Sequence, residues 1–260
     1  MGSGPPLLAP RYVWWMPMRG LLKRRRDRTG PQTAGVGAAD TPAGPPAVEL
    51  DGVTIRYTEA DGAQRSIVEG FSLRIPQGRV HCLAGRSGSG KTSLLRVATA
   101  TQRPTAGTVT WAETPIAGLN HKQLAEARRK HMGYVDQGAT VIEELTVLDN
   151  VLIPAMPQSI TKETTERANE LLELFGLAAA RRQKTRSLSG GERQRLAIVR
   201  GLLLRPTAIA LDEPTASLDR TTANTVIDAM HTAARSGAAV LVASHDPEVI
   251  SSSHTVTRLV

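Results

Sequence analysis

The residues with the clearest chemical capacity form a glycine-rich segment about a third of the way along the chain. Eight consecutive residues match the pattern G-x-x-x-x-G-K-[ST], namely Gly85, Arg86, Ser87, Gly88, Ser89, Gly90, Lys91 and Thr92. Glycines at these positions let backbone N–H groups turn inward around a phosphate, and a helix that begins after them points its positive end at the same anion. The pattern predicts that Lys91 reaches the β- and γ-phosphates of a nucleotide and that Thr92 ligates Mg²⁺. A glycine-rich turn without a ligand is the alternative, but the apolar run before it and the helical pattern after it favour a phosphate-binding loop.

A pair of adjacent carboxylates follows far downstream. The apolar run Ala208–Leu211 ends in Asp212 and Glu213, and Pro214 then stops the strand. On its own, a strand that ends in two acidic residues is common and indicates no function. In enzymes with a phosphate loop, an aspartate at this position orders Mg²⁺, and an adjacent glutamate can hold and deprotonate the attacking water. We therefore expect Asp212 to be a metal ligand and Glu213 to be the general base.

A third candidate site lies between these two motifs. Leu188–Glu192 reads Leu-Ser-Gly-Gly-Glu, and a serine followed by two glycines at the start of a helix makes a second anion site. This segment resembles the signature sequence of the ATP-binding cassette family, which few other phosphate-loop proteins carry. The resemblance implies that Ser189, Gly190 and Gly191 close over a nucleotide. The alternative is an ordinary serine N-cap with Glu192 in the first turn.

The resemblance extends over about residues 48–258, and four further positions match markers of the family in the right order. Tyr57 matches the aromatic residue that stacks on adenine, and the alternative is a core or edge tyrosine. Gln137 matches the glutamine that joins the Mg²⁺ shell and couples a helical subdomain to the core. Asp219 ends the loop that contacts the partner cassette, and His245 matches the histidine that touches the γ-phosphate. A lone histidine is more often structural, but this one ends an apolar strand that follows both earlier motifs.

The resemblance therefore implies a full set of catalytic groups and nucleotide contacts, with ATP and Mg²⁺ as the bound groups. The implied catalytic residues are Lys91, Gln137, Glu213 and His245. The implied nucleotide contacts are Tyr57, Gly85, Arg86, Ser87, Gly88, Ser89, Gly90, Lys91, Thr92, Ser93, Ser189, Gly190, Gly191 and Asp219. The implied Mg²⁺ ligands are Thr92, Gln137 and Asp212.

The family also implies partners. Two cassettes pack head to tail, so that each signature closes over the ATP held by the other, and a homodimer is expected. The cassettes power a separate integral membrane permease, which places the chain in the cytoplasm at the inner face of the cell membrane. Gly133–Gln137 and Leu145–Val151 are similar to the lipoprotein-release, macrolide-export and cell-division group, which favours an export-type system. Two alternatives stay open: a mechanical or signalling role on a membrane protein, and a soluble cassette ATPase that acts on DNA or ribosomes.

The motifs need a scaffold, and the apolar patterns predict one of alternating strands and helices. Ala208–Leu211 and Ala239–Ala243 are typical of buried strands, with a helical stretch, Ala223–Ala234, between them. This order predicts an α/β fold with a mostly parallel core sheet whose two faces are covered. The family implies in addition an antiparallel β subdomain and a helical subdomain at about 138–200. The other predicted elements are strands at Val48–Tyr57, Ser66–Ile75 and Val80–Ala84 and helices at Ser93–Ala98 and Glu163–Phe175, the last within a largely helical stretch from 120 to 200.

Charge and composition limit the remaining classes. The chain has 260 residues and a net charge of +8, but residues 1–47 hold seven basic and two acidic side chains, a net charge of +5. The rest is nearly neutral, which argues against nucleic acid as a partner. We predict a disordered, basic arm rich in Pro and Gly at 1–47 and the ATPase domain at 48–260. No apolar run approaches the length of a membrane-spanning helix, and the single cysteine, Cys82, is expected to be a core residue without a disulfide.

Overall fold

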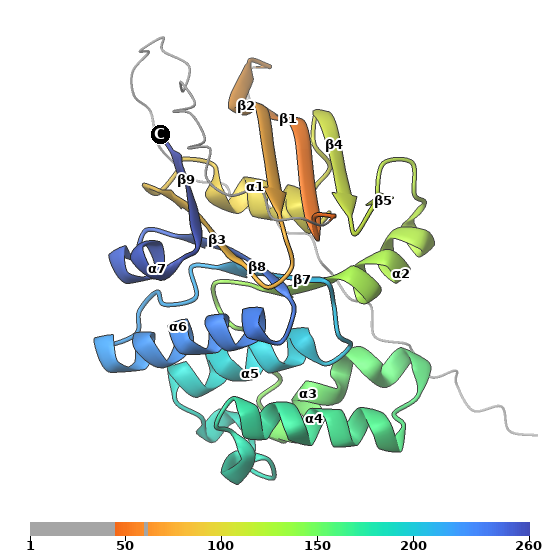
Figure 1. Ribbon diagram of the computed structural model, residues 1–260, viewed down its shortest axis with the longest axis vertical. Coiled ribbons are helices and arrows are strands. Elements are labelled where there is room, and N and C mark those ends of the chain that lie inside the picture. The colour runs from red at the N-terminus through yellow and green to blue at the C-terminus, as the bar shows by residue number, and fades with distance from the viewer. Residues whose placement is uncertain (1–44, 60–61) are drawn as a thin grey trace, which may run out of the picture. The chain divides into compact units, whose positions relative to one another are not determined.

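The computed structural model describes residues 45–59 and 62–260, so the predicted arm at 1–47 lies almost entirely outside the described residues. The described chain folds into two sheets with helices packed around them (Figure 1). Within the described ranges, no helix is long and apolar enough to cross a membrane.

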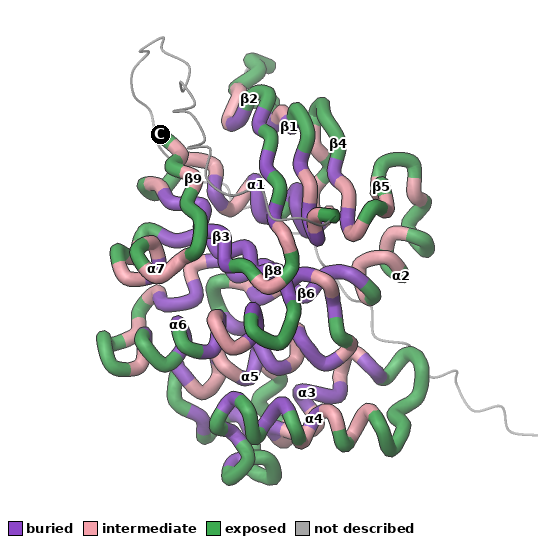
Figure 2. Tube along the Cα trace, viewed as in Figure 1, coloured by how far each residue is buried: buried purple, intermediate pink, exposed green. Residues whose placement is uncertain are grey.

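The larger sheet has five strands, and every neighbouring pair is parallel. In spatial order the strands are β6 (Met132–Val135), β7 (Ala208–Asp212), β8 (Ala239–Ser244), β3 (Val80–Gly85) and β9 (Thr255–Leu259). Every residue of β7 and β8 is buried because helices cover both faces, and for the same reason these strands are continuous apolar runs in the sequence. Figure 2 shows β3 buried and β9, at the sheet edge, largely exposed. The predicted parallel core sheet is confirmed.

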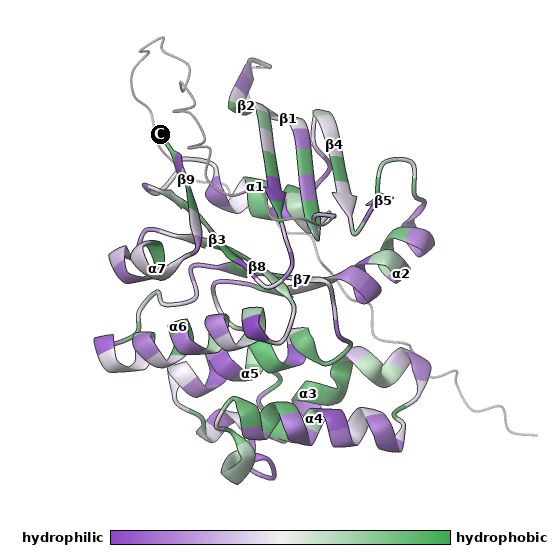
Figure 3. Ribbon diagram, in the orientation of Figure 1, coloured by the Kyte–Doolittle hydropathy of each residue, from purple (hydrophilic) through white to green (hydrophobic). Residues whose placement is uncertain are grey.

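Helices cover the two faces of this sheet. Helix α1 (Lys91–Ala98) packs on one face, and α5 (Gly190–Leu202) and α6 (Arg220–Arg235) pack on the other (Figure 1). Figure 3 shows hydrophobic stretches along β3 and β8, whereas the helices carry both hydrophilic and hydrophobic residues. Cys82 lies in β3 as a core residue, as predicted, and burial raises the pKa of its thiol to about 12. This thiol is therefore protonated and unreactive at neutral pH.

The smaller sheet is antiparallel, with the strand order β2-β1-β4-β5. Its strands are β1 (Val48–Thr58), β2 (Gln64–Ile75), β4 (Ala106–Trp111) and β5 (Thr114–Pro115). The sheet shares a hydrophobic core with α1, and the Nε1 of Trp111 donates to the carbonyl oxygen of Ala98 at 2.7 Å. Helix α1 is therefore held between the two sheets, which fixes the direction in which its first turn points.

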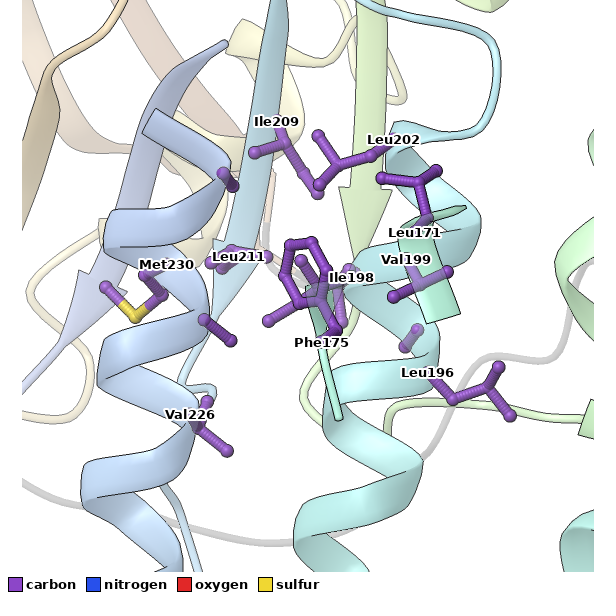
Figure 4. Close-up of a cluster of buried hydrophobic side chains, with 14 of the residues drawn as sticks. Leu171, Phe175, Leu196, Ile198, Val199, Leu202, Ile209, Leu211, Val226 and Met230 are labelled. Carbon is purple, nitrogen blue, oxygen red and sulfur yellow. The ribbon is translucent and has the colours of Figure 1, made fainter. Parts of the chain in front are cut away.

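The segment between β6 and β7 is mainly helical. It holds α3 (Val147–Leu152), the 3₁₀ helices η1 (Ile153–Gln158), η2 (Ala178–Ala180) and η3 (Thr185–Ser187), and α4 (Lys162–Leu174); α2 (His121–His131) precedes β6 and α7 (Pro247–Ser252) follows β8. The predicted apolar face of α4 is buried, with Ala168, Leu171, Leu172 and Phe175 in the core. Figure 4 shows Phe175 in one cluster with Ile198 of α5. Each fully buried leucine here stabilises the fold by about 1.5–3 kcal/mol.

The largely helical stretch predicted at 120–200 contains one strand, β6, that the sequence patterns did not indicate. Met132–Val135 pairs in parallel with β7, and four residues are too few for a period of two to show. A Cβ at Gly133 would lie 2.7 Å from the carbonyl oxygen of Gly201. The glycine therefore lets α5 pack directly on the backbone of this strand.

Candidate active site

The predicted phosphate loop joins the carboxyl end of β3 to the first turn of α1. Gly88 and Gly90 have φ angles of 85° and 94°, in the left-handed region that disfavours side chains. A Cβ on Gly85 would lie 2.5 Å from Ser89 Oγ and 2.7 Å from the carbonyl oxygen of Leu259. Glycine is therefore required at position 85 because neighbouring atoms lie too close for a side chain, and at positions 88 and 90 because of the backbone conformation.

Lys91 is the first residue of α1, and its side chain is buried inside the loop. Its Nζ donates to the carbonyl oxygens of Gly85 at 2.8 Å and Arg86 at 3.1 Å, and it lies 3.4 Å from Glu213 Oε1. The N-cap of α1 is Gly90, which has no side chain with which to cap the helix. Because the first N–H groups of a helix have no partners within it, an uncapped helix start beside a buried ammonium group suits an anion such as phosphate.

Asp212 lies at the carboxyl end of β7, beside the first turn of α1. The Thr92 hydroxyl donates to Asp212 Oδ1 at 3.1 Å, so two of the three predicted Mg²⁺ ligands lie together. Burial raises the pKa of Asp212 above its ordinary value; the Thr92 hydrogen bond opposes this rise, and the charge of Glu213 adds to it. Hydroxyl and carboxylate oxygens are ligands that Mg²⁺ accepts, so the pair fits this ion chemically. In the described part of the chain, no three His, Cys, Asp or Glu side chains form a metal cluster by themselves.

Glu213 and His245 lie at the carboxyl ends of the neighbouring strands β7 and β8. Glu213 Oε2 lies 2.9 Å from His245 Nδ1, and its other carboxylate oxygen faces Lys91. The Glu213 backbone is left-handed, with φ at 46°, and its N–H donates to the carbonyl oxygen of Ala243 at 2.9 Å. Such strain in a residue other than glycine persists only where the surroundings hold it, which is common at functional sites. The Glu213 side chain is 12% exposed and that of His245 is 69% exposed, so the carboxylate is shielded while the imidazole is accessible.

Tyr57 lies in β1, close to the phosphate loop. Its hydroxyl is hydrogen-bonded to Ser93 Oγ at 3.2 Å and donates to Gln102 Oε1 at 2.9 Å. The residue is 40% exposed, so it is not a core tyrosine, and of the two alternatives from the sequence only the edge tyrosine stays open. The structure thus brings two predicted nucleotide contacts, Tyr57 and Ser93, together beside α1.

Gln137 lies exposed in the turn that follows β6. Because β6 pairs with β7, Gln137 and Asp212 belong to the same edge of the sheet. Among the residues that the structure describes, no hydrogen bond joins Gln137 to Asp212 or Thr92. Its role as a Mg²⁺ ligand therefore stays a prediction.

The signature residues begin α5 as a capping box. The Ser189 hydroxyl accepts a hydrogen bond from the Glu192 N–H at 3.3 Å, and the Glu192 carboxylate accepts from the Ser189 N–H at 2.8 Å. The hydrogen bonds from the Ser189 backbone and side chain lower the pKa of Glu192. Ser189 therefore has the N-cap role that the sequence left open as an alternative. Since Ser189 is exposed, this role is compatible with a contact to a nucleotide.

The fold does not bring the signature to the phosphate loop of the same chain. Helix α5 packs on the face of the parallel sheet opposite α1 (Figure 1). The signature instead adjoins the start of α6, where a Cβ at Gly191 would collide with Thr222 Cγ2. The N–H of Thr222 donates at 3.1 Å to Asp219, the N-cap of α6. The signature thus lies beside the end of the loop at Asp219.

Sequence reasoning missed a polar group beside His245. Asp246 accepts a hydrogen bond from the Thr215 hydroxyl at 2.8 Å and forms an ion pair with Arg220 at 3.2 Å. The only local signal was an acidic residue directly after the histidine. The two partners are 31 and 26 residues away in the sequence, beyond the reach of a local pattern.

Comparison with known proteins identifies the class that this fold and site define. A family described as ABC transporter matches residues 68–216, more than half of the chain, and the chain belongs to this family. It is the ATP-binding subunit of an ABC transporter and an ATPase. The predicted fold class, ATPase activity and transport function are confirmed.

Individual relatives agree with the predicted lipoprotein-release group. The chain is 37% identical to the lipoprotein-releasing system ATP-binding protein LolD of Bordetella pertussis over 209 residues, which are 78% of this chain and 89% of that protein. It is 35% identical to LolD of Chromohalobacter salexigens over 215 residues, which are 82% of this chain and 90% of that protein.

Solved structures show the same fold. A dimeric structure of the ATP-binding cassette MJ0796, in a post-hydrolysis state bound to ADP and Pi, matches with a TM-score of 0.72 and 30% identity, covering 82% of this chain and 94% of that one. The cbiO1 protein of Clostridium perfringens, part of an ABC transporter complex, matches with a TM-score of 0.73 over 84% of this chain and 88% of that one. At 22% identity, this second likeness shows the fold alone.

Proposed function

We propose that the chain hydrolyses ATP at sites shared between two copies of itself and so drives an export-type membrane permease of the lipoprotein-release kind. The observation that carries this proposal is the placement of Lys91, Glu213 and His245 at one edge of the parallel sheet, while the signature Ser189–Gly191 begins a helix on the far face. One chain therefore supplies complementary halves of two sites. The dimeric cassette among the solved relatives supports the pairing, and the lipoprotein-releasing systems of the sequence relatives support the export direction.

Nucleotide binding follows from the geometry of the phosphate loop. The backbone N–H groups from Gly85 to Thr92 and the Lys91 ammonium bind the phosphates, and the exposed ring of Tyr57 packs against the adenine. Mg²⁺, held by Thr92, Asp212 and Gln137, would neutralise the phosphate charge and align the terminal phosphate. The signature and Asp219 of the second copy then cover the nucleotide.

Hydrolysis depends on the shielded carboxylate of Glu213. This carboxylate takes a proton from the attacking water. The left-handed backbone of Glu213 sets the direction in which the side chain leaves the chain. Lys91 and His245, which flank the carboxylate, donate to phosphate oxygens on which negative charge accumulates. Loss of the terminal phosphate removes a shared ligand between the two copies, so the dimer opens.

A cavity of about 290 Å³ offers a place for the permease. It lies where α2, β6, η1 and α5 meet, and its lining combines basic and apolar residues, among them Arg129, Met132, Pro154, Arg200 and Leu204. Arg200 also donates to the carbonyl oxygen of Thr140 at 2.7 Å, three residues beyond Gln137. A cytoplasmic segment of the permease that contacts this cavity would therefore be linked to the Gln137 turn. In this proposal the protein is peripheral on the inner face of the membrane.

Affinity purification tests the membrane partner. The tagged full chain with Glu213→Gln is incubated with solubilised membranes of the source cell and ATP, and the bound proteins are identified by mass spectrometry. We expect a membrane protein with several spans. Arg129→Glu, which lines the cavity, should lose this partner, while Lys130→Glu makes the same charge change at the exposed next position and should retain it. Recovery of only ribosomal, DNA-bound or cytosolic proteins would contradict the proposal.

A further inference from the structure

Asp246, the residue after His245, is bonded to both ends of the loop that follows Glu213. Its Oδ2 accepts a hydrogen bond from the Thr215 hydroxyl at 2.8 Å, and its Oδ1 lies 3.2 Å from a guanidinium nitrogen of Arg220. Thr215 is two residues after Glu213, and Arg220 is the first residue of α6. The Asp246 side chain is only 15% exposed. A single shielded carboxylate therefore ties the histidine loop to the segment that connects β7 with α6.

Helix capping explains only part of these contacts. Asp246 is the N-cap of α7, and its Oδ1 accepts from the Glu248 N–H at 3.0 Å. Its own N–H donates to Ser244 Oγ at 3.0 Å, which fixes the backbone on either side of His245. A cap requires one side-chain oxygen. The second oxygen, Oδ2, accepts from the Thr215 hydroxyl instead, so it serves the connection between the two loops.

The position of His245 depends on this connection. The imidazole is 69% exposed, and in the part of the chain that the structure describes its one hydrogen bond is with Glu213. An exposed side chain with so few contacts is placed mainly by its backbone. That backbone is held at Asp246 on one side, and on the other the Ala243 carbonyl oxygen accepts from the Glu213 N–H.

We propose that Asp246 is a positioning residue for ATP hydrolysis, which holds the His245 loop against the loop after Glu213 so that the imidazole faces the terminal phosphate while the carboxylate faces the attacking water. The inference rests on the catalytic roles proposed above for Glu213 and His245. The inference extends these roles, because the loop to which Asp246 is hydrogen-bonded ends at Asp219, where the second copy is expected to make contact. Asp246 thus links the segment expected at the subunit contact to the loop that carries His245.

Variants of the full chain test this role in steady-state ATP hydrolysis. Asp246→Ala should lower kcat roughly 10- to 100-fold while the KM for ATP changes less than about twofold, because geometry rather than binding is lost. Thr215→Val, which removes one hydrogen bond and keeps the side-chain shape, should lower kcat in the same way but less. Thr215→Ser keeps the hydroxyl and should restore most of the rate. Glu248→Gln changes the other acidic partner of Arg220 and should leave kcat near that of the wild type.

A double-mutant cycle separates positioning from a general loss of stability. In a His245→Ala background, Asp246→Ala should lower the single-turnover rate less than about twofold, because the residue through which Asp246 acts is already absent. An equal loss in both backgrounds, or a loss confined to KM or to the thermal midpoint, would overturn the proposal. If His245→Ala is slow and Asp246→Ala is normal, the positioning role alone fails. If His245→Ala hydrolyses ATP at the wild-type rate, the catalytic assignment fails, and the positioning role fails with it.

Discussion

Glu213 Oε2 lies 2.9 Å from His245 Nδ1, although the two residues are 32 positions apart in the sequence. Their proximity follows from the sheet, because β7 and β8 are adjacent and parallel and Asp212 is paired with Ala243. Residues that follow these strands must therefore meet at one edge. Strand β3 pairs with the other side of β8, so the phosphate loop reaches the same edge. Parallel topology thus converts separate sequence motifs into one site.

Replacement of Gly85 by alanine should destabilise the protein, since the new Cβ would lie 2.5 Å from Ser89 Oγ and 2.7 Å from the Leu259 carbonyl oxygen. We expect the free energy of unfolding, measured by urea denaturation, to fall by about 1–3 kcal/mol. Gly138→Ala is the matched control, because its Cβ would meet nothing closer than Thr140 Oγ1 at 3.8 Å, and should change stability by less than about 0.5 kcal/mol. Equal stability of the two variants would show that the loop tolerates a side chain at position 85.

Asp212→Asn should abolish ATP hydrolysis and yet stabilise the protein in the absence of nucleotide. Burial raises the pKa of Asp212, so its folded-state pKa lies above its unfolded value, and ionisation at neutral pH costs stability that returns as pH falls through the folded pKa. Asparagine removes this charge and can still accept the hydrogen bond of Thr92. The thermal midpoint near neutral pH should rise by roughly 2–4 °C for each kcal/mol relieved.

The control for this change is Asp228→Asn, which removes the same charge from an exposed position on α6 and should leave the midpoint unchanged. A lower thermal midpoint for Asp212→Asn than for the wild type, both measured without nucleotide, would show that the charged form of Asp212 stabilises the fold instead of destabilising it.

Glu192→Gln should weaken the pH dependence of stability in acid. The hydrogen bonds from Ser189 hold the pKa of Glu192 below its ordinary value, so the carboxylate contributes stability above its unfolded pKa of about 4.3 and loses it as pH falls through the depressed folded pKa. The free energy of unfolding, measured by urea denaturation at a series of pH values, should fall less steeply in the variant below about pH 4.3. Glu173→Gln, on the exposed side of α4, is the control and should keep the wild-type slope. Identical slopes for all three proteins would exclude a stabilising role for this capping box.

The elements that position the site could largely be predicted from the sequence. The strands before Asp212 and before His245 are continuous apolar runs, and the strand before the phosphate loop is apolar apart from His81, which is the pattern that burial on both faces produces. The buried face of α4 followed from apolar residues at helical spacing. The start of α5 at Gly190 followed from Ser189 and the two glycines after it.

Other features depend on contacts that no local pattern reveals. Strand β6 is too short to show a period, and its pairing with β7 spans the whole helical segment between them. The contacts of Asp246 with Thr215 and Arg220 join the histidine loop to the segment that leads from β7 into α6. Each partner alone is an ordinary polar residue. The left-handed backbone of Glu213 is likewise imposed by its surroundings, since glutamate has no preference for that region.

The measurement that most directly tests the shared site is the mass in solution of the Glu213→Gln full chain, determined by size-exclusion chromatography with light scattering. With ATP and Mg²⁺ the protein should have twice the monomer mass of 27.8 kDa, and with ADP it should return to the monomer. Hydrolysis by this variant should be slower than that of the wild type by roughly 100-fold or more. A monomer that binds ATP without pairing, or turnover at the wild-type rate, would contradict the account.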